Sequence, residues 1–186
     1  MMFKISFTTP LAARACVAAL VLGLAGMAAA ATPLSHRSAT MQCADRRITV
    51  EADCFAFTPG TTMCTRQSIR FAGPDGKALG ERAFKSMPLK NADYPVVPEQ
   101  IGELTCVETP DKKTFLVALM DTGGNCEDCE WNDVYSADGA LVGSTRNGKE
   151  PGAAAASAID AAYDARKKHV LGHQALTPFY RLGGAR

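Results

Sequence analysis

The stretch that decides the fold reads Ile48-Thr-Val-Glu-Ala-Asp-Cys54, followed by the turn Thr58-Pro-Gly60 and a second Thr-rich segment that contains Cys64. Apolar and polar residues alternate along the first segment, which is typical of a strand with one buried face. A Pro-Gly pair favours a turn, so residues 48–57 and about 63–72 are expected to form an antiparallel hairpin.

The same pattern of strands and turns continues along the chain. Further strands are expected at residues 78–84, 104–107, 114–120, 131–137 and 140–145. Gly73-Pro-Asp-Gly76 and Asp138-Gly139 supply two of the turns between them. Residues 87–102 contain three prolines and are expected to form an irregular loop, because proline cannot donate a ladder hydrogen bond.

An alanine-rich segment follows Asn147-Gly148. Its residues Ile159, Tyr163 and Val170 recur at helical spacing, which predicts a helix over about 152–171 that packs on the sheet. The expected fold class is therefore α+β and mainly antiparallel β. It comprises a sheet of about six to seven strands built from hairpins, with one C-terminal helix packed on it and disulfides that stabilise it.

The first 31 residues have the pattern of a cleaved secretory signal peptide. Lys4 and Arg14 precede a run of small and apolar residues over 15–31, and cleavage is expected after Ala30 or Ala31. An uncleaved membrane anchor is the alternative, but this run is shorter than the roughly 20 apolar residues that a spanning helix needs. The expected location is periplasmic or secreted, with no membrane span after cleavage.

Removal of the leader leaves 155 residues with 18 basic and 19 acidic side chains. This near-neutral balance argues against a nucleic-acid partner, and the length suits one domain. Residues 32–45 show no periodicity and are expected to be an exposed lead-in to a single β-rich domain over 46–182.

Six cysteines remain once Cys16 is removed with the leader, and an even number in an oxidising compartment predicts three disulfides. In the first hairpin, pairing of residue 57 with residue 61 places Cys54 opposite Cys64, close enough for a bridge. Cys126 and Cys129 are expected to close a local loop. Cys43 and Cys106 are then paired by elimination.

The segment Cys126-Glu-Asp-Cys129-Glu-Trp131 allows three interpretations. A redox dithiol fits the Cys-x-x-Cys spacing, but Glu127 and Asp128 oppose thiolate formation and a strand pattern follows. A zinc site would need Cys106, or His169 with His173, as further ligands, and the acidic residues lack the spacing of a calcium loop. The leading interpretation is a disulfide-pinned loop rimmed with solvated acids, with Trp131 covering the bridge.

No phosphate-binding loop, nucleophile elbow or zinc-protease motif occurs, so no catalytic residue, metal or cofactor is predicted. The expected function is that of a secreted or periplasmic non-catalytic protein that binds a ligand or an envelope protein partner through its sheet and the acidic loop. The candidate recognition residues are Glu127, Asp128, Glu130 and Trp131. This hypothesis requires Glu130 and Trp131 to lie exposed on one patch. The alternative is a periplasmic thiol-disulfide or metal-binding protein that uses Cys126 and Cys129.

Overall fold

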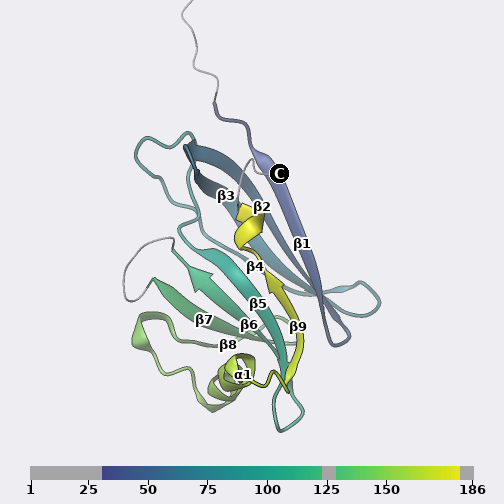
Figure 1. The fold of residues 1–186 in the computed structure, drawn as a ribbon. Coiled ribbons are helices and arrows are strands. Elements are labelled where there is room, and N and C mark those ends of the chain that lie inside the picture. The colour runs from purple at the N-terminus through teal and green to yellow at the C-terminus, as the bar shows by residue number, and fades with distance from the viewer. Residues whose placement is uncertain (1–30, 123–128, 181–186) are drawn as a thin grey trace, which may run out of the picture. The chain divides into compact units, whose positions relative to one another are not determined.

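The computed structural model describes residues 31–122 and 129–180 and contains the expected first hairpin, formed by β2 (Arg46–Thr58) and β3 (Thr61–Ala72) (Figure 1). Gly60 takes a positive φ of 81° in the turn, a conformation that glycine adopts without steric cost. β1 (Ser35–Cys43) and β4 (Ala78–Ala83) flank this hairpin in a four-stranded antiparallel sheet with the order β1-β2-β3-β4.

A second antiparallel sheet has five strands in the order β8-β7-β6-β5-β9. Its members are β5 (Gln100–Glu108), β6 (Thr114–Asp121), β7 (Glu130–Ser136), β8 (Leu141–Ser144) and β9 (Val170–Ala175). The expected hairpins β5–β6 and β7–β8 are confirmed, as is the mainly antiparallel β class. The expectation of one sheet with six to seven strands is wrong, because the described residues form two sheets.

The division into two sheets takes place in the proline-containing segment 84–99. Pro88, Pro95 and Pro98 interrupt the ladder here, and the segment forms only an isolated bridge between Met87 and Val96. The chain thus crosses from β4 to β5 without pairing these two strands. The irregular loop expected over 87–102 is present, except that β5 already begins at Gln100.

Residues 32–45 are not an exposed lead-in, because Ser35–Cys43 pairs with β2 along its whole length as β1. Met41 and Cys43 are buried, whereas Ser38 and Thr40 on the opposite face are exposed. The inward positions also include the partly buried Arg37. Apolar and polar residues therefore do not alternate regularly along this strand.

The helix is shorter than the predicted 152–171, since α1 spans Ala153–Tyr163. The Asp164 side chain accepts a hydrogen bond from the Arg166 backbone N–H at 3.1 Å and so favours a turn over another helical turn. Val170–Ala175 then extends along β5 as β9, where Gly172 is a strand residue instead of a helix terminator.

The main core lies between the two sheets. The first sheet contributes Ile48, Ile69 and Phe71 to it, and the second contributes Leu104 and Tyr135. A second cluster lies between α1 and the outer face of the five-stranded sheet. Its members are Val107, Phe115, Val117, Val134, Ala155, Ala158, Ala161 and Ala162. The small alanine side chains allow the helix to lie close to the sheet.

Two disulfides join pairs of described residues, and they are the pairing expected within the first hairpin and the one reached by elimination. Cys54–Cys64 joins β2 to β3 inside the first hairpin, and Cys43–Cys106 joins β1 of one sheet to β5 of the other. Leu176 and Tyr180, at the C-terminal end of the described chain, are buried in the main core.

Within the described ranges, the structure contains no helix whose length and hydropathy would suit a membrane span.

Candidate functional site

The strand register brings acidic side chains together on the outer face of the five-stranded sheet. Glu130 pairs with Asp121, and one row further along the ladder Asn132, Leu119 and Glu103 lie side by side on β7, β6 and β5. These outward positions alternate with the inward residues of the main core. Three neighbouring carboxylates, without a Lys or Arg at the outward positions of these rows, give this region a negative charge.

We call this region the acidic face and define it by Glu103, Asp121, Glu130, Asn132, Tyr163 and His173. Helix α1 covers the other end of the same outer face, where Val107, Phe115, Val117 and Val134 are buried beneath it. The helix ends at Tyr163, and the acidic face begins there.

Tyr163 is the exposed aromatic residue of the acidic face. The residue is 57% exposed, and its hydroxyl donates a hydrogen bond to the Asn132 side-chain oxygen at 2.9 Å. Partial burial raises the pKa of the Tyr163 hydroxyl, and the negative charges of Glu103 and Glu130 raise this pKa further. The two carboxylates therefore make the electrostatic potential around the Tyr163 side chain more negative.

His173 on β9 borders the acidic face on its other side. Its Nε2 lies 2.8 Å from the Glu103 carboxylate, which also accepts a hydrogen bond from the Thr105 hydroxyl at 3.2 Å. The His173 and Glu103 side chains are 42% and 37% exposed, so both are accessible to a ligand. Their contact fixes the orientation of the Glu103 carboxylate.

Trp131 does not belong to this surface, and its predicted exposure is wrong. Only 4% of Trp131 is exposed, because even and odd residues of β7 point to opposite faces and Trp131 points into the main core. The Arg146 guanidinium covers its ring at 4.5 Å. Glu130, its neighbour in sequence, is exposed on the acidic face. The predicted patch that contains both residues therefore does not exist.

The remaining predicted loop residues, Glu127 and Asp128, lie outside the described residues, as does Cys126. Cys129 is disulfide-bonded, and only 3% of the residue is exposed. Among residues 31–122 and 129–180, no group of three His, Cys, Asp or Glu side chains lies close enough to hold a metal ion.

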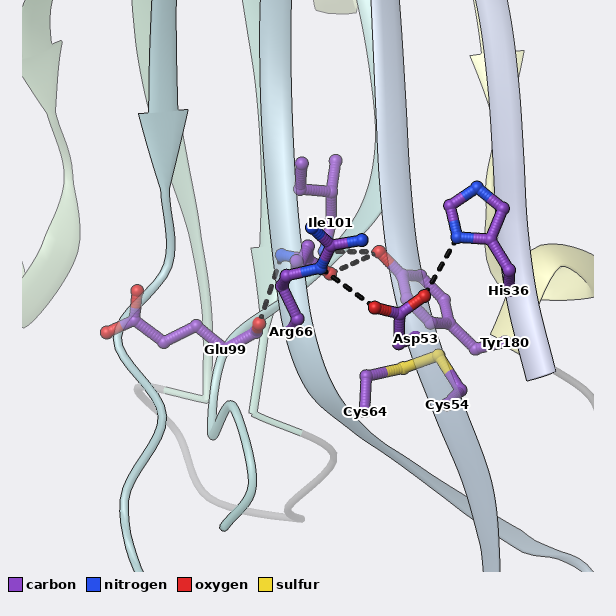
Figure 2. Close-up of a disulfide and its surroundings, with 9 residues drawn as sticks. His36, Asp53, Cys54, Cys64, Arg66, Glu99, Ile101 and Tyr180 are labelled. Atoms are coloured by element: carbon purple, nitrogen blue, oxygen red, sulfur yellow. Dashed lines mark hydrogen bonds and ion pairs between the residues drawn. A yellow bond between two sulfur atoms is a disulfide. The ribbon is translucent and has the colours of Figure 1, made fainter. Parts of the chain in front are cut away.

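A second charged cluster lies on the outer face of the four-stranded sheet, next to the Cys54–Cys64 disulfide (Figure 2). The Asp53 carboxylate contacts His36 Nδ1 and Arg66 Nε, both at 2.8 Å. The hydrogen bond from His36, and then the interactions with Arg66, lower the pKa of Asp53. One anion shared by two basic side chains is satisfied internally, so this cluster has the character of a cross-strand ion pair.

The same disulfide adjoins a buried polar network, which Figure 2 also shows. The Tyr180 hydroxyl lies 2.5 Å from the Gln67 side-chain oxygen and accepts the Ile101 backbone N–H at 3.2 Å. The Gln67 amide nitrogen in turn donates to the Glu99 carbonyl oxygen at 3.2 Å. Gln67 is fully buried, and this network satisfies its side chain at the junction of the two sheets.

Of the acidic face, only Glu130 was predicted from the sequence to be a recognition residue. His173 was considered as a metal ligand, and Tyr163 was expected in the packed stripe of the helix. A partial signal for Tyr163 existed, because alanines occupy most of the buried positions of α1 and leave little depth for a large ring. His173 could not be placed on this face without strand β9, because no strand was expected after the helix predicted over about 152–171.

Comparison with protein-family models, curated proteins and solved structures finds no match to this chain.

Proposed function

We propose that this chain is a non-catalytic protein of the periplasm or the extracellular space that binds a Lys- or Arg-rich segment of a partner protein through the acidic face. The leader-like sequence and the disulfides support an oxidising compartment. The surface described by Glu103, Glu130 and Tyr163 replaces the predicted patch around Trp131.

The observation that carries this proposal is the position of the Tyr163 ring. The ring is exposed, is anchored through its hydroxyl to Asn132, and lies within the electrostatic influence of Glu103 and Glu130. An anchored aromatic ring loses little conformational entropy on binding. A cation over its face gains a cation–π interaction, and the nearby carboxylates can accept charge-assisted hydrogen bonds.

The charge of the acidic face indicates which kind of partner segment can bind to it. The outward positions of the acidic face carry carboxylates on three strands, so an acidic segment would be repelled and a purely apolar segment would remove water from charged groups. Lys and Arg side chains of an extended segment could instead pair with Glu103 and Glu130 while their methylene groups contact Tyr163 and Leu119. A basic protein segment is therefore the partner that we infer.

A titration of the ¹⁵N-labelled protein with two hexapeptides tests this proposal. One peptide consists of arginine and the other of glutamate. We expect the arginine peptide alone to shift the resonances of the acidic face, and added salt to weaken its binding. Tyr163→Ala should lower the affinity about two- to fivefold, as expected for loss of an exposed cation–π contact.

The matched control is Glu150→Gln, which changes the same charge as Glu130→Gln at an exposed position before α1. We expect Glu130→Gln to weaken arginine binding more than Glu150→Gln does. Equal effects of the two variants, or resonance shifts that map to another face, would show that only the net charge attracts the peptide and would overturn the proposal.

A further inference from the structure

The backbone of Thr32, close to the predicted signal-peptide boundary, is held at two points by the segment between β4 and β5. Its N–H donates to Asp93 Oδ2 at 2.9 Å, and its carbonyl oxygen accepts a hydrogen bond from the Tyr94 hydroxyl at 2.9 Å. Ala31, immediately before it, is exposed. The chain is thus fixed to the domain from Thr32 onward.

Tyr94, one of the two residues that hold Thr32, is itself packed against the domain. The Tyr94 ring packs edge-to-face against Phe55 with ring centroids 5.2 Å apart, and Phe55 is 1% exposed. The surrounding segment is closed by two hydrogen bonds of 2.8 Å between the backbones of Met87 and Val96. The Tyr94 hydroxyl is thus a preorganised donor to the Thr32 carbonyl oxygen, and Asp93, its neighbour in the same closed segment, is the acceptor for the Thr32 nitrogen.

The Asp93 carboxylate faces the neutral amide of Thr32 in the uncleaved chain. The hydrogen bonds from Thr32 lower the pKa of Asp93, and no Lys or Arg side chain of the described residues is among the causes of this shift. A carboxylate facing a neutral amide makes a weaker interaction than one facing an ammonium group. Asp93 is thus placed to receive a positive charge that an uncleaved backbone lacks at Thr32.

We propose that signal peptidase cleaves the bond between Ala31 and Thr32, and that Asp93 and Tyr94 form the binding site for the new N-terminus. Water hydrolyses the amide bond, so that Ala31 ends in a carboxylate and the Thr32 nitrogen becomes a primary amine. This amine is protonated below its usual pKa of about 7.7–8.0 and pairs with the Asp93 carboxylate.

The contact also discriminates between the two cleavage positions that the sequence leaves open. Either cleavage site is preceded by alanine at the last position before the bond and again two positions earlier. The leader sequence alone therefore does not distinguish the two sites. Cleavage after Ala30 would place the ammonium group on the exposed Ala31 and leave an amide opposite Asp93. Only cleavage after Ala31 places the charge at the nitrogen that Asp93 contacts.

The inference rests on the predicted leader but is independent of the acidic face, so the two proposals can fail separately. N-terminal sequencing and intact-mass measurement of the full chain, exported by a bacterial host, give the first test. We expect a mature N-terminus at Thr32. Any other N-terminus, or a chain that keeps its leader, would overturn the proposal.

A pH titration of the α-amine by NMR gives the second test, on chains that begin at Thr32 or at Ala31 after removal of a cleavable tag. The titratable groups that contact Thr32 are the Asp93 carboxylate, at its nitrogen, and the Tyr94 hydroxyl, at its carbonyl oxygen. We expect a raised amine pKa in the Thr32 chain and a smaller shift in the Ala31 chain. Asp93→Asn should abolish the shift, whereas the exposed control Asp160→Asn should preserve it. An amine pKa insensitive to Asp93→Asn would refute the site.

Pairing with Asp93 raises the pKa of the amine in the folded state. The stabilisation from this pair is therefore fully present at pH values below the amine pKa of the unfolded chain. This stabilisation is lost as the pH rises through the amine pKa of the folded protein. Thermal unfolding of the Thr32 chain should therefore lose an Asp93-dependent increment of Tm between neutral and alkaline pH.

Discussion

The Arg82 guanidinium on β4 and the Asp133 carboxylate on β7 form an ion pair of 2.7 Å that joins the two sheets. Asp133 is 3% exposed in its side chain, and the same Arg82 nitrogen donates to the Tyr135 hydroxyl at 2.6 Å. Burial raises the pKa of Tyr135, so its hydroxyl stays neutral and can accept this hydrogen bond. Arg82 also lies 4.8 Å above the Phe84 ring.

Replacement of Asp133 by Asn should therefore destabilise the fold, because Arg82 would keep its charge and lose its closest anion. We expect the free energy of unfolding to fall by about 2 kcal/mol, less than for a fully buried pair because Arg82 still reaches water. Urea denaturation measures this change. Asp160→Asn, at an exposed helix position, should change stability by less than about 0.5 kcal/mol, and equal losses in both variants would contradict the assignment.

The turn between β7 and β8 should not tolerate a side chain at Gly139. This residue has a φ of +91°, and a Cβ atom there would lie 2.6 Å from Cδ2 of the buried Phe71. We expect Gly139→Ala to reduce the free energy of unfolding by about 2–4 kcal/mol. Gly76 has a similar φ of +79° with open space around it, so Gly76→Ala should cost only about 1 kcal/mol. A similar loss in the two variants would show that Phe71 moves aside freely.

The Cys43–Cys106 and Cys54–Cys64 disulfides should contribute unequally to stability. Cys43–Cys106 spans 63 positions in sequence and Cys54–Cys64 spans 10. In the chain-entropy description, loss of the first by double Cys→Ala replacement should cost about 4 kcal/mol, and loss of the second about 3 kcal/mol. Chemical denaturation of the two double variants compares them directly. A larger loss from the shorter loop would reverse the predicted order.

The Asp53 ion pairs should make stability depend on pH in the acidic range. The pKa of Asp53 is lowered in the folded state. Its ion pairs therefore contribute to the free energy of unfolding at pH values above the Asp53 pKa of the unfolded chain, about 3.9. This contribution is lost as the pH falls through the Asp53 pKa of the folded protein. We expect Asp53→Asn to cost about 0.5–1 kcal/mol at pH 7 and to converge with the parent protein in acid. Unfolding curves at several pH values test this, and a difference that persists unchanged in acid would exclude the ionic origin.

The hairpins could be predicted from sequence because they depend on neighbouring residues. The turn at Gly60 and the alternation before it sufficed to place Cys54 opposite Cys64. The division into two sheets could not be predicted, since the prolines of 84–99 indicate a break in pairing but not where the chain continues. β1 was missed because Arg37 occupies an inward position, and β9 because Val170 also fits a helical period.

The acidic face could likewise be predicted only in part from the sequence. Glu130 and Trp131 are adjacent in sequence, and a loop would present both, but a strand directs them to opposite faces. Tyr163 lies near Glu103 only because the helix ends at Tyr163 and because the registers of β5, β6 and β7 place Glu103, Leu119 and Asn132 in one row. Such a surface depends on contacts that no local pattern contains.

The hydrogen bond between Gln67 and Tyr180 spans 113 residues and joins β3 to the last described turn of the chain. Leu176 and Tyr180 complete the main core, so the core cannot close until the C-terminal segment has emerged. A chain that crosses a membrane from its N-terminus would therefore remain incompletely folded until transport is nearly finished.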